Sequence, residues 1–243
     1  MVKKSMPKKH KVPSKNQPIF KIVGGFFKLF IFRNIKVTYL CSKEEIPNKC
    51  IMVSNHSAKN GPMALELYLP IFNVKWGAHQ MLGNYSSRFH YLRDVFYIQK
   101  CGWGKFKATI KAGIEALFSK MLYKGMKFVP TYPDGRLTQT IKQSIEILDD
   151  DKAILVFPED SNEGYKEIMT SFFSGFVLLS LQYFKKTGED LPIYPIYYHQ
   201  KKKIIIVGKP LFVQELVNKG MNRDQIAELF CEEVNNLFLN NIK

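Results

Sequence analysis

Cysteine is scarce in this chain, and the cysteines present are not spaced for a disulfide framework or a metal centre. Only four occur in 243 residues, and no two of them form a Cys-x-x-Cys pair. No secretory leader with a cleavage site is recognisable, so we expect reduced thiols in a cytosolic protein. The histidines also lack ligand spacing, and we therefore expect no metal and no cofactor. The cysteines are Cys41, Cys50, Cys101 and Cys231.

Long apolar runs and the glycine motifs of several enzyme classes are absent as well. Hydrophobic residues make up 46% of the chain, yet no stretch of about 18 uncharged apolar residues occurs, which argues against a membrane-spanning helix. The chain lacks a Gly-x-Ser-x-Gly sequence, which disfavours a thioesterase of the α/β-hydrolase type. It also lacks a glycine-rich phosphate loop. The length suits one large domain with a substantial core.

Acidic residues are missing from the first 43 positions, which contain ten lysines and one arginine in a chain of net charge +15. We expect residues 1–18 to form a flexible basic tail. Residues 19–33 are predicted to be an amphipathic interfacial helix, because positions 19–32 are apolar apart from two lysines and two glycines.

This basic, apolar beginning predicts an anionic membrane surface as a partner and a peripheral location on the cytoplasmic face of the cell membrane. The alternative is an ordinary first helix that packs on the core behind a solvated tail. No nucleic acid is expected, since no recognised nucleic-acid-binding motif accompanies the charge.

Residues 34–243 are predicted to be a single domain in which strands alternate with helices, the pattern of an α/β fold. The helix at 105–123 is amphipathic, with an apolar row on one face and lysines facing water. Asn222 is expected to cap the last helix. The apolar row comprises Ile110, Ile114, Leu117, Phe118 and Met121. The predicted strands span 35–40, 50–55, 74–78, 127–132, 153–157, 192–198 and 203–207, and the helices span 62–68, 86–100, 105–123, 138–148, 170–185 and 222–239.

Two polar loops follow two of the predicted strands. His56 lies where an apolar strand stops and a glycine-containing turn begins, and the strand at 153–157 is followed by the polar loop 158–164. Two such loops suggest one site. Imidazole suits a general base there because its unperturbed pKa near 6.5 leaves a neutral nitrogen at cellular pH. A purely structural histidine is the alternative.

Four sequence blocks support an enzymatic interpretation by their order. They are Asn-His followed by Gly-Pro at 55–62, Phe-Val-Pro with a later Gly-Arg at 128–136, Phe-Pro-Glu-Asp-Ser-Asn at 157–162, and Leu-Pro-Ile-Tyr-Pro-Ile at 191–196. In this order, across roughly residues 36–210, they resemble the blocks of the glycerolipid (lysophosphatidic acid type) acyltransferase family. The third block of that family typically reads Phe-Pro-Glu-Gly-Thr-Arg.

The resemblance implies a glycerol-3-phosphate acyltransferase-like α/β fold with a mixed, largely parallel sheet covered by helices. It also implies a reaction. His56 would accept the proton of an acceptor hydroxyl, which attacks a fatty-acyl thioester carried by coenzyme A or an acyl carrier protein. The acyl thioester donor and the lipid acceptor are thus the expected small partners, and the acyl carrier protein is a further one.

The chain departs from the family pattern at the acid that orients the histidine. Asn60 stands where an aspartate is expected, and the spacing is one residue shorter. In a serine protease the corresponding acid-to-amide change costs about 10⁴ in turnover. Glu66, and Glu159 or Asp160 on the other loop, are the candidates to restore the charge. Otherwise the chain is a non-catalytic lipid-binding relative.

A second departure concerns the acceptor. Asn162 replaces the family's arginine, whose planar donor fork binds the acceptor phosphate. Arg136 and Lys59 are expected to compensate, although Arg136 also has Asp134 as a neighbour for a surface ion pair. The acceptor is then a lysophospholipid, glycerol phosphate, or another hydroxyl- or amine-bearing lipid. The predicted substrate-binding residues are Lys59, Gly61, Arg136, Glu159, Asp160, Ser161 and Asn162.

Overall fold

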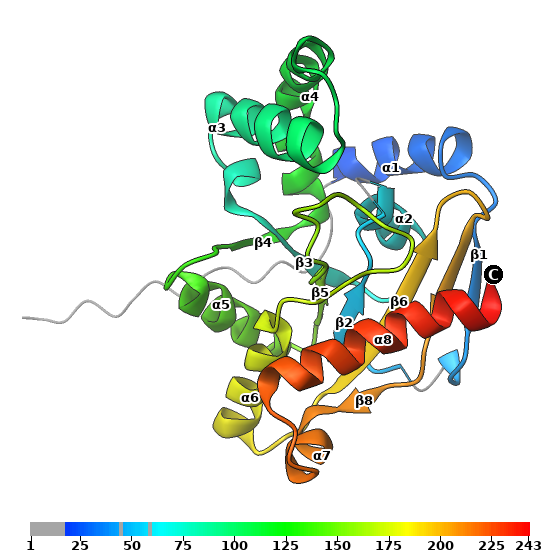
Figure 1. The fold of residues 1–243 in the computed structure, drawn as a ribbon, viewed down its shortest axis with the longest axis vertical. Coiled ribbons are helices and arrows are strands. Elements are labelled where there is room, and N and C mark those ends of the chain that lie inside the picture. The colour runs from blue at the N-terminus through cyan, green and yellow to red at the C-terminus, as the bar shows by residue number, and fades with distance from the viewer. Residues whose placement is uncertain (1–17, 44–45, 58–59) are drawn as a thin grey trace, which may run out of the picture.

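The backbone forms one mixed β-sheet between two layers of helices (Figure 1). The structure is a computed structural model that describes residues 18–43, 46–57 and 60–243. Within these ranges the strands are β1 (Lys36–Tyr39), β2 (Ile51–Ser54), β3 (Asn73–Ala78), β4 (Phe128–Thr131), β5 (Ala153–Val156), β6 (Pro192–His199), β7 (Ile204–Val207) and β8 (Leu211–Phe212). Their order across the sheet is β1-β7-β6-β2-β5-β3-β4, and β8 pairs with β6.

Most of the strand pairs are parallel, which confirms the predicted α/β fold with a mixed, largely parallel sheet. β6 runs antiparallel to β7 and β8, and the other pairs in the described residues are parallel. The helices are α1 (Pro18–Phe30), α2 (Asn60–Tyr68), α3 (Tyr85–His90), α4 (Lys105–Met126), α5 (Leu137–Asp149), α6 (Gly175–Thr187), α7 (Val213–Asn218) and α8 (Arg223–Asn241). A 3-10 turn, η2 (His79–Leu82), and a π-helix, η3 (Tyr91–Lys100), complete them.

Helices cover both faces of the sheet. Because successive residues of a strand point to opposite sides, neighbouring residues enter different core clusters. Ile51 and Val53 of β2 belong to a core cluster with the buried residues of α5, α6 and α8. Met52, between them, belongs to a second cluster with α2 and with Phe20 of α1. The central strands are therefore apolar at almost every position, which is typical of strands covered on both faces.

Several boundaries differ from the sequence prediction. The helix expected from residue 170 begins at Gly175, because the preceding residues are extended and Phe172 forms a β-bridge with Glu159. The helix expected at 86–100 changes to π-helical geometry at Tyr91. β8 and α7 were not predicted. Asn222 caps α8 as predicted, in a reciprocal capping box with Gln225.

The segment between β3 and β4 is a helical excursion, defined here as residues 79–126 and comprising η2, α3, η3 and α4. It has its own small core, in which Leu92 and Phe96 of η3 pack with alanines of α4. The apolar row predicted for α4 exists, but it does not face this core. The side of α4 that is buried carries Ala108, Ala112, Ala116 and Ser119.

The N-terminal helix lies next to the end of this excursion. Phe20 of α1 is buried, and a Cβ added at Gly125 of α4 would lie 2.6 Å from the Phe20 Cβ. Glycine at position 125 therefore permits the close contact between the two helices. In the parts of the chain that the structure describes, no helix has both the length and the apolarity needed to cross a membrane.

Candidate functional site

The site is built on the carboxyl ends of β2 and β5. The two strands are parallel neighbours, with Val53 opposite Val156, so the loops that follow them emerge at the same edge of the sheet. Ligands of open α/β sheets commonly bind at this edge, outside the carboxyl ends of the strands. The first loop contains His56, and the second contains Glu159 and the residues after it.

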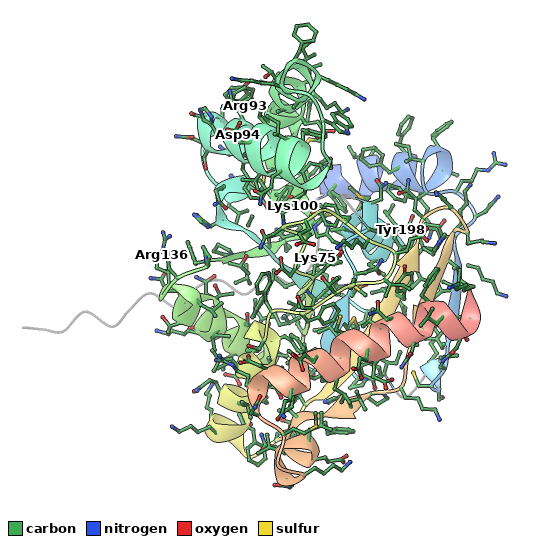
Figure 2. The ribbon with its side chains drawn as sticks, in the orientation of Figure 1. Lys75, Arg93, Asp94, Lys100, Arg136 and Tyr198 are labelled. Carbon is green, nitrogen blue, oxygen red and sulfur yellow. The ribbon has the colours of Figure 1, made fainter. Side chains whose placement is uncertain are left out.

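Asn55 fixes the start of the first loop. Its side-chain amide donates to the Tyr198 carbonyl oxygen at 2.9 Å, and its side-chain oxygen accepts from the Tyr198 N–H at 2.8 Å. Asn55 is buried, so both hydrogen bonds are protected from water. Tyr198 belongs to β6, the other neighbour of β2, and Figure 2 labels it. The asparagine of the first block thus joins β2 to β6 immediately before the histidine.

His56 lies against the second loop, as the two-loop prediction requires. Its backbone N–H donates to a carboxylate oxygen of Glu159 at 3.0 Å. Its ring stacks on Tyr165, with centroids 5.2 Å apart, and meets the edge of Phe157 at the same separation. Loops that are about a hundred residues apart in sequence therefore form one site.

The imidazole of His56 is neutral over the physiological range. Burial lowers the pKa of His56 to about 3, and the positive charge of Lys100 lowers it further in the same direction. Its Nδ1 atom is buried, and no described residue forms a hydrogen bond with it. The ring is thus a neutral imidazole held by aromatic contacts, without a carboxylate on Nδ1 among those residues.

Asn60 and Gly61 begin α2 directly behind the histidine. The Gly61 N–H donates to the His56 carbonyl oxygen at 3.1 Å, and the Asn60 N–H donates to that of Ser57 at 3.3 Å. A Cβ on Gly61 would lie 2.4 Å from the His56 carbonyl oxygen. Gly61 therefore allows the helix to start against the histidine. Lys59, also a predicted substrate-binding residue, lies outside the described residues.

Glu66 forms no hydrogen bond with the Nδ1 atom of His56. It forms a buried ion pair with Lys75 of β3, whose ammonium group also donates to the Asn73 side-chain oxygen at 2.8 Å. Lys75 is fully buried, and burial lowers its pKa while the Glu66 charge opposes this shift. The structure therefore gives Glu66 an ionic partner inside the fold.

Lys100 is a residue of this site that the sequence did not reveal. It ends η3, and its ammonium group donates to the Ser161 hydroxyl oxygen at 2.7 Å and lies 5.8 Å from the Tyr165 ring centroid. Because His56 stacks on the same ring, Tyr165 has the cation and the imidazole as neighbours. Burial lowers the pKa of Lys100, and the charges of Glu159 and Asp160 oppose that shift.

The second loop is held in place by its own hydrogen bonds. Glu159 is buried, and burial raises its pKa while the His56 N–H and Lys100 lower it. The Asp160 side chain accepts from the Asn162 N–H at 3.1 Å, which closes a tight turn over Ser161. Asn162 itself is exposed. The loop therefore presents Glu159 and Ser161 inward and Asn162 outward.

Arg136 lies apart from these groups. Its guanidinium forms an exposed ion pair with Asp134 at 2.7 Å and covers the Tyr132 ring. Figure 2 shows Arg136 at the outer edge of the molecule and Lys100 near its centre. The surface ion pair expected as one alternative is therefore present. Among the described residues, no three side chains of the types that bind metals gather in one place.

Comparison with solved structures finds a similar protein, the 1-acyl-sn-glycerophosphate (LPA) acyltransferase PlsC from Thermotoga maritima. The two chains are 14% identical, the TM-score is 0.47, and the match covers 93% of this chain and 80% of that one. No family model and no curated protein matches the chain. At this identity and TM-score, nothing about the site of this chain follows from the likeness.

Proposed function

We propose that this protein is a membrane-associated O-acyltransferase that moves a fatty acyl group from a thioester to a hydroxyl of an anionic lipid acceptor. The thioester is carried by coenzyme A or an acyl carrier protein. The observation that supports this most directly is the hydrogen bond from the His56 N–H to Glu159, because it joins the two sequence blocks that resemble acyltransferase blocks. His56 is the general base of the proposed reaction.

In the proposed step, a ring nitrogen of His56 takes the proton of the acceptor hydroxyl, and the hydroxyl oxygen attacks the thioester carbonyl carbon. The carbon–sulfur bond then breaks, and the leaving thiolate receives the proton from the imidazolium. A neutral imidazole can begin this cycle at any pH well above 3. A pKa as low as this also makes the ring a weak base, so a charge that raises the pKa would help.

Lys100 connects acceptor binding to that base. We assign it the role of binding the negative headgroup, since Asn162 lacks the arginine charge and Arg136 lies elsewhere. Lys100 is partly buried and already donates to Ser161, so it is fixed beside the ring. Headgroup charge at Lys100 would offset the effect of the ammonium on His56 and raise the basicity of the imidazole when the acceptor is bound.

The transfer reaction is tested by incubating the purified protein and a His56→Ala variant with a labelled acyl thioester and a pool of lipid acceptors. We expect acylated lipid from the unsubstituted chain alone. Equal product from both proteins would remove His56 from the mechanism. Thermal unfolding of both proteins should be compared, so that loss of product is not mistaken for loss of the fold.

The role of Lys100 is tested with Lys100→Met and, as a matched loss of one lysine, Lys142→Met on the exposed side of α5. A hydrogen bond to a charged group contributes about 1.5–3 kcal/mol, so we expect KM for lysophosphatidate to rise by about 10- to 100-fold in Lys100→Met. KM for an uncharged monoacylglycerol should change little. An equal effect on both acceptors would contradict headgroup binding by Lys100.

A second function is favoured by one observation, the buried Nδ1 of His56 that has no hydrogen-bond partner among the described residues. A base without an orienting acid suits a non-catalytic lipid-binding protein of the same fold. That function predicts binding of lysophosphatidate by calorimetry, with Lys100→Met weakening it, and no acylated product from any thioester.

A further inference from the structure

Helix α4 has its large apolar residues on the outside and its small residues on the inside. Ala108, Ala112 and Ala116 have no exposed surface and pack on the core of the helical excursion. On the opposite side, Phe106 is 81% exposed and Phe118 is 60% exposed. The complete exposed row, at successive helical turns, is Phe106, Ile110, Ile114, Leu117, Phe118 and Met121. Single exposed apolar residues are ordinary, but a continuous row of this size marks an interaction surface.

Helix α1, which packs on the end of α4, carries a second exposed apolar row. Phe20 is buried against the end of α4, while Ile22, Phe26 and Leu29 face outward and are more than half exposed. Phe30 continues this row and contacts Phe26, with ring centroids 4.5 Å apart. Figure 1 shows α1 and α4 at the same end of the molecule, away from α7. We call the two rows together the apolar rim.

The charges next to the apolar rim are almost all positive. Helix α4 contains five lysines and one acidic residue, Glu115, which is paired with Lys111 at 3.2 Å. Helix α1 contains two exposed lysines, Lys21 and Lys28, and no acid. Lys107, Lys120 and Lys124 of α4 are exposed as well. A second copy of the chain would bring these lysines face to face, whereas an anionic bilayer would neutralise them.

We infer that the apolar rim is a two-helix membrane-docking surface, in which the α4 row enters the interfacial region of an anionic bilayer together with the α1 row. This deepens the proposed function, since it names how the enzyme meets its lipid substrates, and it assigns to α4 a role that the N-terminal segment alone does not supply. Apolar side chains on both helices enter the boundary between headgroups and acyl chains, and the flanking lysines meet the headgroups.

Insertion of α4 is tested with a fluorescent probe in the row. Phe118→Trp should shift its emission to the blue and be quenched by brominated acyl chains on vesicles of phosphatidylcholine and phosphatidylglycerol in equal parts. The matched control is Asn218→Trp, an exposed position of α7 at the opposite end of the molecule (Figure 1). It should show neither effect. The native Trp76 and Trp103 are common to both variants. Equal quenching in the two variants, or none in either, would overturn the inference.

The contribution of the row to binding is tested with the triple variant Ile114→Ser, Leu117→Ser, Phe118→Ser. Each large apolar side chain withdrawn from water is worth about a tenfold change in partitioning, so the partition coefficient measured by vesicle sedimentation should fall by about tenfold if one of the three side chains inserts and by about a thousandfold if all three do. The control Val217→Ser, Leu239→Ser removes exposed apolar residues of α7 and α8 and should bind normally. Unchanged binding of the triple variant, or its conversion from dimer to monomer in solution, would contradict the membrane assignment.

Catalysis and docking can fail separately. The His56→Ala variant should bind vesicles like the unsubstituted chain, because His56 is not one of the exposed apolar residues that define the rim. If His56→Ala is inactive but binds, both proposals stand. If the triple serine variant still acylates a detergent-dispersed acceptor but no longer binds vesicles, the α4 row serves docking and is not needed for the transfer reaction. Normal vesicle binding by that variant would reject docking by α4 whatever its activity.

Discussion

The buried pair of Lys75 and Glu66 gives a sharp test of whether Glu66 serves the fold or the chemistry. Lys75 has no exposed side-chain surface and Glu66 only 8%. Replacing Lys75 by Met would remove the ammonium group that pairs with the buried Glu66 carboxylate. Removal of one partner from such a pair costs about 3–5 kcal/mol of unfolding free energy. For a chain of this length, each kcal/mol corresponds to about 2–4 °C, so we expect the Tm to fall by roughly 6–20 °C.

The double variant Lys75→Met, Glu66→Leu should recover most of that loss, because two apolar side chains of similar volume can replace an ion pair at little cost. Recovery will be incomplete by about 1 kcal/mol, since the Asn73 oxygen loses the lysine donor at 2.8 Å. Thermal unfolding followed by circular dichroism measures the three proteins side by side.

The same double variant separates the two roles of Glu66. If Glu66 is only the partner of Lys75, the double variant transfers acyl groups at nearly the unsubstituted rate once it is folded. If Glu66 supplies the charge that Asn60 lacks, the variant is stable but loses turnover by several orders of magnitude, in line with loss of an orienting acid. A double variant no more stable than Lys75→Met would refute the view that the main cost of losing Lys75 is the buried charge of Glu66.

Two further predictions concern the histidine and its loop. Gly61→Ala should reduce the rate of acyl transfer by more than about tenfold, because the added Cβ would lie 2.4 Å from the His56 carbonyl oxygen and displace the loop. The control is Gly25→Ala, where an added Cβ meets no other atom. It should stabilise α1 by about 1 kcal/mol without loss of rate. Stability should fall with acidification between about pH 6.5 and the His56 pKa of about 3, since the unfolded chain binds a proton there that the folded chain excludes. In His56→Gln, the slope of the unfolding free energy against pH, measured by urea denaturation over this window, should be smaller by up to about 1.4 kcal/mol per pH unit. Identical slopes in the two proteins would contradict burial of the neutral ring.

Strand positions and the α/β class were predictable from the sequence because they depend on local apolar patterns. Runs such as 51–54 and 153–156 are apolar at nearly every position, as strands covered on both faces must be. The approach of the His56 and Glu159 loops was predicted only from the two polar loops that each follow an apolar strand, and the pairing of β2 with β5 that brings them together is a finding of the structure. Strand order was not predictable, since nothing in the sequence near β1 identifies β7 as its neighbour.

The orientation of α4 was not predictable from periodicity. The helix has a row of large apolar residues and, opposite it, a row of alanines, and either row can be the packed one. The structure places the alanines inward, where they are fully buried against Leu92 and Phe96 of η3. Lys100 was missed for a related reason, because it is 61 positions before Ser161 and reaches the loop only through the helical excursion.

The pairing of β1 with β7 has a consequence for how the chain acquires its shape. Lys36 pairs with Ile204, and in the described part of the chain β1 borders no strand nearer in sequence. At a synthesis rate of about 5–20 residues per second, the partner strand is made roughly ten seconds or more after β1. During that interval β1 lacks the strand with which it pairs, whereas α1 can already pack on the end of α4. The membrane docking proposed above for α1 and α4 can therefore begin before the sheet is complete.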